Sequence, residues 1–265
     1  MDPFEGFKTQ QKLGWAHFAP LEAVTAIPGA NLVRFAGVRE GQVVLDVGCG
    51  TGVTTIAAAR AGAKVSALDL TPELLDRARF NAQVAGVEVD WREGDVEKLP
   101  YEDASFDVVL SQFGHIFAPR PAVAIGEMLR VLKPGGMIVF STWPPELFTG
   151  RMFALIAKYL PPPPQGVAPP PQWGDRSVVQ ERLGAAVRDI SFETGTMLYP
   201  ALSPAHHRLG TERTAGPLVK LVEMLTANDP AKLEAFRREY DALAAEYFRD
   251  NAVHQVYLMT RAVKN

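Results

Sequence analysis

The sequence is poor in three things: cysteine, excess basic charge and long hydrophobic runs. Cys49 is the one cysteine in 265 residues, which excludes an intramolecular disulfide framework and a multi-cysteine zinc site. The net charge of −3 gives no general attraction to phosphate backbones, so we expect no nucleic-acid partner. The apolar runs are too short to span a bilayer, and the start MDPFEGFKTQQK lacks the pattern of a signal peptide. We therefore expect a cytoplasmic globular protein with no membrane partner.

What the sequence does contain is an alternation of strand and helix patterns up to Thr142. Short apolar runs predict strands at residues 43–47, 64–69, 87–92, 106–111 and 137–141. Helical patterns lie between them, and one begins with Thr71-Pro72-Glu73, which joins a capping hydroxyl to a proline in the first turn. This order predicts a parallel sheet with helices on both faces and a ligand crevice at the carboxyl ends of its strands.

The composition changes after Trp143. Nine of the 21 prolines lie between residues 144 and 171, which indicates either a stiff cap segment on the sheet or a surface loop. A sixth strand is expected near residues 190–197 and a last one at residues 253–263. Two apolar helical stripes, at residues 218–225 and 233–247, lie between them. These stripes must bury against each other over the carboxyl edge of the sheet, or against a second copy in a dimer.

The strongest single signal is the run Asp46-Val47-Gly48-Cys49-Gly50-Thr51-Gly52, which follows the first predicted strand. Glycines let a backbone pass close under a ligand, and the next helix directs its free N–H groups at the same spot. The spacing G-x-G-x-G differs from the dinucleotide pattern G-x-G-x-x-G. Asp46 would repel a pyrophosphate. It suits a ligand whose cationic amino group lies beside its own carboxylate, as in the methionine half of S-adenosylmethionine.

The segment from Val44 to Thr142 resembles the class I S-adenosylmethionine-dependent methyltransferases, and within them the group of ubiquinone and menaquinone biosynthesis methyltransferases. VLDVGCGTG is similar to the family's glycine motif, and GDVEKLPYEDASFDVVLSQFG followed by EMLRVLKPGG is similar to its later motifs. The resemblance implies an α/β, Rossmann-like sheet of seven strands, the last antiparallel, with a helical cap. We expect a single domain over residues 1–265. Its parts would be N-terminal lid helices at 1–40, a cofactor-binding core at 41–142, a proline-rich cap segment at 143–189, and final strands with a helical insertion at 190–265.

The resemblance also implies which residues hold the cofactor, S-adenosyl-L-methionine. Asp69 would accept hydrogen bonds from both ribose hydroxyls, and Leu70 would pack on the adenine. Asp95 would accept from the adenine amino group, and the backbone N–H of Val96 would meet the ring. Gln112 would either hold the methionine part through backbone atoms or orient the substrate. With the glycine loop, the predicted cofactor-binding residues are Asp46, Gly48, Cys49, Gly50, Gly52, Asp69, Leu70, Asp95, Val96 and Gln112.

His115 is the candidate for a general base, because it follows the fourth predicted strand in the sequence FGHIF. The alternative is a histidine that donates to a backbone carbonyl in that loop. The sulfonium methyl group is already activated, so alignment of the acceptor can supply much of the rate without a base. Trp15 and Phe18 are expected in a lid over the cofactor. Since the adjacent His206 and His207 share no helix face, we predict no metal site.

These features predict an enzyme that transfers a methyl group to a small, partly apolar acceptor at an oxygen, carbon or nitrogen atom. Aromatic residues at Phe117, Trp143, Phe148 and Trp173 suggest an apolar pocket, with ordinary core packing as the alternative. Two other functions stay open. One is a nicotinamide-dependent oxidoreductase, which the glycine spacing and Asp46 disfavour, and the other is a non-catalytic protein that binds S-adenosylmethionine. The chain would act as a monomer or a homodimer.

Overall fold

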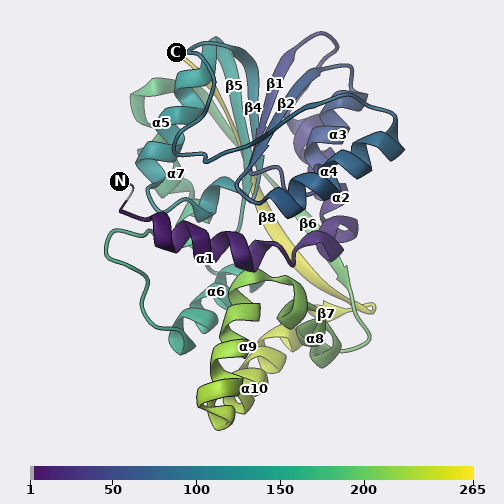
Figure 1. Ribbon diagram of the computed structural model, residues 1–265, viewed down its shortest axis with the longest axis vertical. Coiled ribbons are helices and arrows are strands. Elements are labelled where there is room, and N and C mark those ends of the chain that lie inside the picture. Colours follow the sequence, from purple (N-terminus) through teal and green to yellow (C-terminus); the bar gives the residue numbers. More distant parts are fainter. Residues whose placement is uncertain (1–2) are drawn as a thin grey trace.

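A computed structural model describes residues 3–265, and one sheet runs through the molecule (Figure 1). Its strands are β1 (Val43–Val47), β2 (Lys64–Asp69), β3 (Asp90–Glu93), β4 (Phe106–Gln112), β5 (Leu132–Thr142), β6 (Val187–Pro200), β7 (Phe248–Arg249) and β8 (Ala252–Lys264). Their order is β3-β2-β1-β4-β5-β8-β6, and β7 pairs with β8 outside this path. The first five strands are parallel, whereas β8 runs antiparallel to β5 and β6. The predicted reversal of the last strand and its place beside the sixth are confirmed. The short β7 is an addition that the sequence patterns did not indicate.

Helices cover both faces of this sheet and one of its ends. In Figure 1, α2 (Glu22–Ala36), α3 (Val53–Arg60) and α4 (Pro72–Ala85) lie on one side, and α5 (Pro121–Val131) and α7 (Arg176–Leu183) lie on the other. The remaining helices gather at the end where the parallel strands have their carboxyl ends. They are α1 (Glu5–Trp15), α6 (Phe148–Tyr159), α8 (Pro204–Thr214), α9 (Gly216–Asn228) and α10 (Pro230–Tyr247).

Local sequence rules place most of these elements well, but β5 starts at Leu132 instead of residue 137, and β3 starts later than expected. The third strand was expected from residue 87, but it starts at Asp90. Gly86 ends α4 in the left-handed conformation, with φ +67°, and the Val87 N–H donates to the Ala82 carbonyl oxygen at 3.1 Å. The residues that follow the helix therefore cap it before strand pairing can begin.

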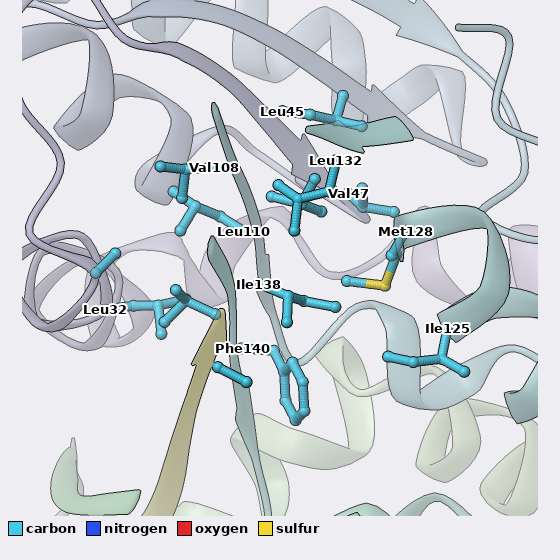
Figure 2. Close-up of a cluster of buried hydrophobic side chains, with 14 of the residues drawn as sticks. Leu32, Leu45, Val47, Val108, Leu110, Ile125, Met128, Leu132, Ile138 and Phe140 are labelled. Carbon is cyan, nitrogen blue, oxygen red and sulfur yellow. The ribbon is translucent and has the colours of Figure 1, made fainter. Parts of the chain in front are cut away.

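The core lies between the sheet and the helices on each side. Figure 2 shows Leu45, Val108 and Leu110 of the central strands with Leu32 of α2 and Met128 of α5. All five side chains are completely buried. Burial of a side chain of this size contributes roughly 1.5–3 kcal/mol to the free energy of unfolding. The packing holds the carboxyl ends of β1 and β4 in fixed positions next to each other.

The helices at the end of the sheet form a cap with a hydrophobic cluster of its own. Leu218, Leu221 and Leu225 of α9 pack with Leu233 and Phe236 of α10. Phe148, Met152 and Ile156 of α6 belong to the same cluster. The expectation that the two helical stripes bury against each other is thus confirmed.

The proline-rich segment divides into an exposed part and an anchored part. Residues 161–166 are exposed, whereas the short 3₁₀ helix Pro170–Gly174 places Trp173 in the core. A Cβ atom at Gly174 would lie 2.0 Å from the Trp143 carbonyl oxygen, so only glycine permits this close approach. The surface-loop interpretation therefore holds for residues 161–166, and the cap-segment interpretation holds for Pro170–Gly174.

Candidate functional site

A cavity opens at the carboxyl ends of β1, β2 and β4, under α1 and the cap. The chain leaves β1 toward β2 on one side while β4 lies on the other, and such a switch in strand order leaves a crevice between the loops. Most of the predicted site residues line this cavity, namely Asp46, Gly48, Cys49, Gly50, Asp69, Leu70, Asp95, Val96, Gln112 and His115. Gly52 is the exception, because it does not face the cavity.

Glycine is required at the three positions of the loop for different physical reasons. At Gly50, with φ +55°, a Cβ atom would point into open space, and that space belongs to the cavity. At Gly48 a Cβ atom would lie 2.8 Å from the Gly114 Cα, and at Gly52 it would lie 2.8 Å from the Trp91 ring. Close approach to a ligand therefore explains only Gly50. Packing against neighbouring chain segments explains the other two.

Asp46 carries a buried carboxylate oxygen that has no partner. The Thr55 hydroxyl donates to Oδ2 at 2.6 Å, while Oδ1 makes no hydrogen bond within residues 3–265. Burial, with a further contribution from the charge of Asp69, raises the pKa of Asp46 to about 7. An unpaired buried acceptor costs free energy unless a ligand donates to it. A cationic amino group in the cavity would meet this requirement.

Asp69 is held at the end of β2 by two backbone amides. The Gly50 N–H donates to Oδ2 and the Thr71 N–H donates to Oδ1, each at 2.8 Å. Burial raises the pKa of Asp69. Each carboxylate oxygen has two acceptor positions, so one remains free on each for a ribose hydroxyl. The contact with Gly50 also ties the glycine loop to the second strand.

Asp95 follows β3 and takes part in an ion-pair network with the N-terminal helix. Lys8 of α1 donates from Nζ to Asp95 Oδ2 at 2.5 Å and to Glu97 Oε2 at 2.6 Å. The Glu97 carboxylate is almost completely buried and also accepts from the Arg120 guanidinium. Asp95 Oδ1 accepts from the Glu97 N–H at 2.9 Å. The network joins α1 to the edge of the cavity where the adenine is expected.

Comparisons with known proteins agree with this geometry. Residues 45–140 match the sequence model of the methyltransferase domain family. A Mycobacterium tuberculosis protein named as uncharacterized is 36% identical over 260 residues, which cover 97% of this chain and 94% of that protein. A ubiquinone biosynthesis O-methyltransferase of Bordetella avium is 36% identical over 130 residues, 48% of this chain and 53% of that enzyme. A solved structure from Bacillus halodurans has the same fold, with a TM-score of 0.60 at 20% identity, and the match covers 89% of this chain and 98% of that one.

The chain is a class I S-adenosylmethionine-dependent methyltransferase. The fold, the glycine loop and the family match together favour methyl transfer over the alternative, a nicotinamide-dependent oxidoreductase. The donor set of the cavity fits this cofactor, since Asp46 offers an unpaired oxygen and Gly50 leaves open space above its backbone. No helix within residues 3–265 is long and apolar enough to cross a membrane.

The surroundings of two other predicted residues, Gln112 and Cys49, restrict the chemistry that each can perform. Both ends of the Gln112 amide are engaged, because Nε2 donates to the Thr25 carbonyl oxygen at 2.8 Å and Oε1 accepts from the Thr54 hydroxyl at 2.7 Å. Gln112 thus ties α2 and α3 to the site through both ends of its side-chain amide. Cys49 is buried, and burial raises the pKa of its thiol, which removes it as a nucleophile.

His115 lies in a setting that disfavours a general base. The ring is completely buried, with centroids 4.7 Å from those of both Phe140 and Trp173. Burial, with the nearby charge of Arg182, lowers the pKa of His115 to about 3. Neither ring nitrogen has a hydrogen-bond partner within residues 3–265, so the alternative of a donor to a backbone carbonyl is not seen either. A neutral ring of such low basicity would take a proton poorly.

The other half of the cavity is lined mainly by aromatic and aliphatic side chains. Trp15 and Phe18 come from the N-terminal region, and the Trp15 ring packs on Phe117 with centroids 4.5 Å apart. Trp143 and Met152 add walls from the end of β5 and from α6. Of the aromatic residues that the sequence suggested, Phe117 and Trp143 line the cavity, whereas Phe148 and Trp173 are ordinary core. No residue of the segment 161–171 lines it, so the proline-rich segment does not cap the cavity itself.

Sequence patterns missed several lining residues that come from distant parts of the chain. Lys8 and Gln11 reach the cavity from α1, Thr149 from α6 and Gln255 from β8. Gln255 did leave a signal, since it alternates in phase with the buried Val253. A lone polar residue in that phase indicates a buried polar role rather than a solvent-facing one.

Proposed function

We propose that this methyltransferase acts on a small, largely apolar acceptor that is nucleophilic without help from a side-chain base. The observation that supports this is the division of the cavity. Its charged lining residues within the described part of the chain, Lys8, Asp46, Asp69 and Asp95, lie on the cofactor side, and its other ionisable lining residues are His115, Cys49 and Tyr199. The half under α1 and α6 is lined by aromatic, aliphatic and neutral polar side chains. Such a surface favours an acceptor with an uncharged, apolar body.

The chain's own residues would hold the cofactor and align the acceptor. Asp46 would accept from the amino group of the methionine part, Asp69 from the ribose hydroxyls, and Asp95 from the adenine amino group, with Leu70 and Val96 beside the ring. When bound, the cofactor supplies an activated methyl group on sulfur. Trp143 and Phe117 would orient the acceptor beside it, and exclusion of water from this apolar half would favour the reaction.

The N-terminal helix would act as a lid over both ligands. Its support is the set of contacts that α1 makes, since Lys8 pairs with Asp95 and the Gln11 amide donates to the Phe117 carbonyl oxygen at 3.1 Å. Gly14 of α1 also packs closely on Gly216 of α9. Opening of α1 would admit the acceptor, and closure would exclude water. Limited proteolysis tests the lid: saturating S-adenosylhomocysteine should slow cleavage near Trp15, and unchanged cleavage would refute it.

Labelled methyl transfer over a panel of metabolites tests the function itself. The acceptor atom can be oxygen, nitrogen or carbon. Oxygen acceptors come first in the panel, because the relative from Bordetella avium is named an O-methyltransferase. We expect label in an uncharged, apolar product, and we expect none with Gly50→Val. Transfer mainly to highly charged acceptors, or to nucleic acid, would contradict the proposal. We also propose that the enzyme works in the cytoplasm as a monomer or homodimer, which fractionation and sedimentation would check.

A further inference from the structure

The acceptor half of the cavity ends at polar side chains to which the proposed function gives no role. Thr149 of α6, Thr211 of α8 and Gln255 of β8 line this end, and each is 6% exposed. His207 and Tyr240 stand behind them and are completely buried. We call these five residues the polar end of the cavity. Polar groups are costly to bury in an otherwise apolar cap, so their arrangement calls for a reason.

Hydrogen bonds join the polar end in one direction. Gln255 Nε2 lies 3.1 Å from His207 Nε2. An amide nitrogen can only donate, so His207 Nε2 must accept, and the neutral ring then carries its proton on Nδ1. Nδ1 donates in turn to the Tyr240 hydroxyl at 3.2 Å, and that hydroxyl lies 2.9 Å from Thr211 Oγ1 and 3.6 Å from Met152 Sδ. The chain ends where the Thr211 hydroxyl donates to the His207 carbonyl oxygen at 3.1 Å.

The protonation state of His207 agrees with this direction. Burial lowers the pKa of His207 to about 4, so the ring is neutral near pH 7. The His207 ring therefore has one defined acceptor, Nε2, and one defined donor, Nδ1. Such a chain holds its first member, the Gln255 amide, in a single orientation.

Gln255 is the member that keeps an unused donor. Its Oε1 accepts from the Thr149 hydroxyl at 3.2 Å, and one of its two N–H groups is used on His207. Within residues 3–265, Nε2 makes no second hydrogen bond, although the residue lines the cavity. The second N–H is thus available to a molecule bound there.

We propose that Gln255 donates this second N–H to a carbonyl oxygen of the methyl acceptor, and that His207 and Tyr240 are positioning residues for the amide. The inference rests on the proposed function, because it concerns the same cavity. It defines the acceptor as an uncharged, largely apolar molecule with a ketone, ester or amide carbonyl away from the methylated atom. A charged group would find no counter-ion among the described residues of this half.

A matched pair of fragments tests the inference without knowledge of the natural acceptor. Acetophenone and α-methylstyrene have nearly the same shape, but one has C=O where the other has C=CH₂. Their dissociation constants would be measured by ligand-observed NMR on protein saturated with S-adenosylhomocysteine. For the wild type, we expect the ketone to bind roughly tenfold more tightly, the effect of one hydrogen bond in a buried site. Equal binding, or no binding of either fragment, would overturn the inference.

Variants separate recognition from general damage to the cavity. Gln255→Met keeps the length of the side chain without a donor and should bind both fragments equally. His207→Leu should reduce the preference, whereas His207→Gln offers an oxygen that can accept from Gln255 and should restore part of it. Phe153 of α6 also lines the cavity, so Phe153→Leu should weaken the binding of both fragments while the preference for the ketone persists. A ketone preference that survives in Gln255→Met would also overturn the inference.

Two separate measurements on the same variants test the proposed function. Calorimetry with S-adenosylhomocysteine reports the cofactor half and the fold of each variant. Transfer of label over the metabolite panel reports catalysis. Loss of the ketone preference with both of these intact would therefore reject only the role of Gln255.

Discussion

Cofactor binding should depend on pH through Asp46, because this carboxyl group keeps its proton up to about pH 7 in the free protein. The raised pKa comes mainly from burial, and Oδ1 has no partner to stabilise the ionised form. A cationic amino group binds the ionised carboxylate, so binding below pH 7 must first release the proton. Affinity therefore rises with pH through 7 and levels off above it.

The size of the effect follows from the pKa. One pH unit below the pKa, about nine in ten Asp46 side chains are protonated, and one unit above it about one in ten. The affinity for S-adenosylhomocysteine should then increase roughly tenfold between pH 6 and pH 8, about 1.4 kcal/mol of binding free energy. At pH 6 binding should release close to one proton, and at pH 8 almost none.

Calorimetry measures both quantities when it is run in buffers of different ionisation enthalpy. Asp46→Asn is the matched control, because it keeps the shape and the Thr55 contact but cannot titrate. Its affinity should be weaker and nearly independent of pH, and any pH dependence that remains would report the neighbouring Asp69. A wild-type affinity that is flat from pH 6 to pH 8, without proton release, would refute the assignment of Asp46 to the amino group.

Three further outcomes are expected. Asp69→Ala should weaken S-adenosylhomocysteine binding by about 1–3 kcal/mol in calorimetry, because a charged acceptor is lost; wild-type affinity would refute its place at the ribose. Gly50→Val should abolish binding, whereas Gly86→Val, at a glycine of similar φ with open space around it, should only lower the melting temperature. Burial lowers the pKa of His115 to about 3 in the folded protein, so the unfolded chain binds a proton there more readily. The free energy of unfolding therefore falls as the pH drops below about 6.5. His115→Leu should therefore lose less stability in urea than the wild type between pH 6.5 and pH 5, by roughly 2 kcal/mol, and parallel curves would contradict this.

The cofactor side of the site was predictable because its residues follow strands directly. Asp46, Asp69 and Asp95 come at or just after the ends of β1, β2 and β3, and parallel neighbours bring such positions to one edge. Periodicity alone locates those strand ends. The physical reason for each glycine was not predictable, since it depends on what lies opposite. Gly48 faces Gly114, and only the tertiary structure makes them neighbours.

The depth of burial was the main property that local patterns could not supply. His115 follows a strand in the same way as the acidic residues, which made it a candidate for a base. The ring is buried because Trp173, 58 positions later in the sequence, returns from the proline-rich segment to cover it. A residue's basicity depends on such distant partners, so it could not be read from the loop sequence.

The sequence by itself determined the alternation of strands and helices, the carboxyl edge as the place of the cavity, and the acids that line it there. These follow from short-range periodicity and from the geometry of parallel strands. The tertiary structure alone decided which residues form the acceptor half. Thr149, His207 and Gln255 come from three separate elements, and the hydrogen bonds between them arise only when the cap packs on the sheet. Acceptor recognition therefore depends on long-range packing, whereas cofactor recognition is encoded next to the strands that carry it.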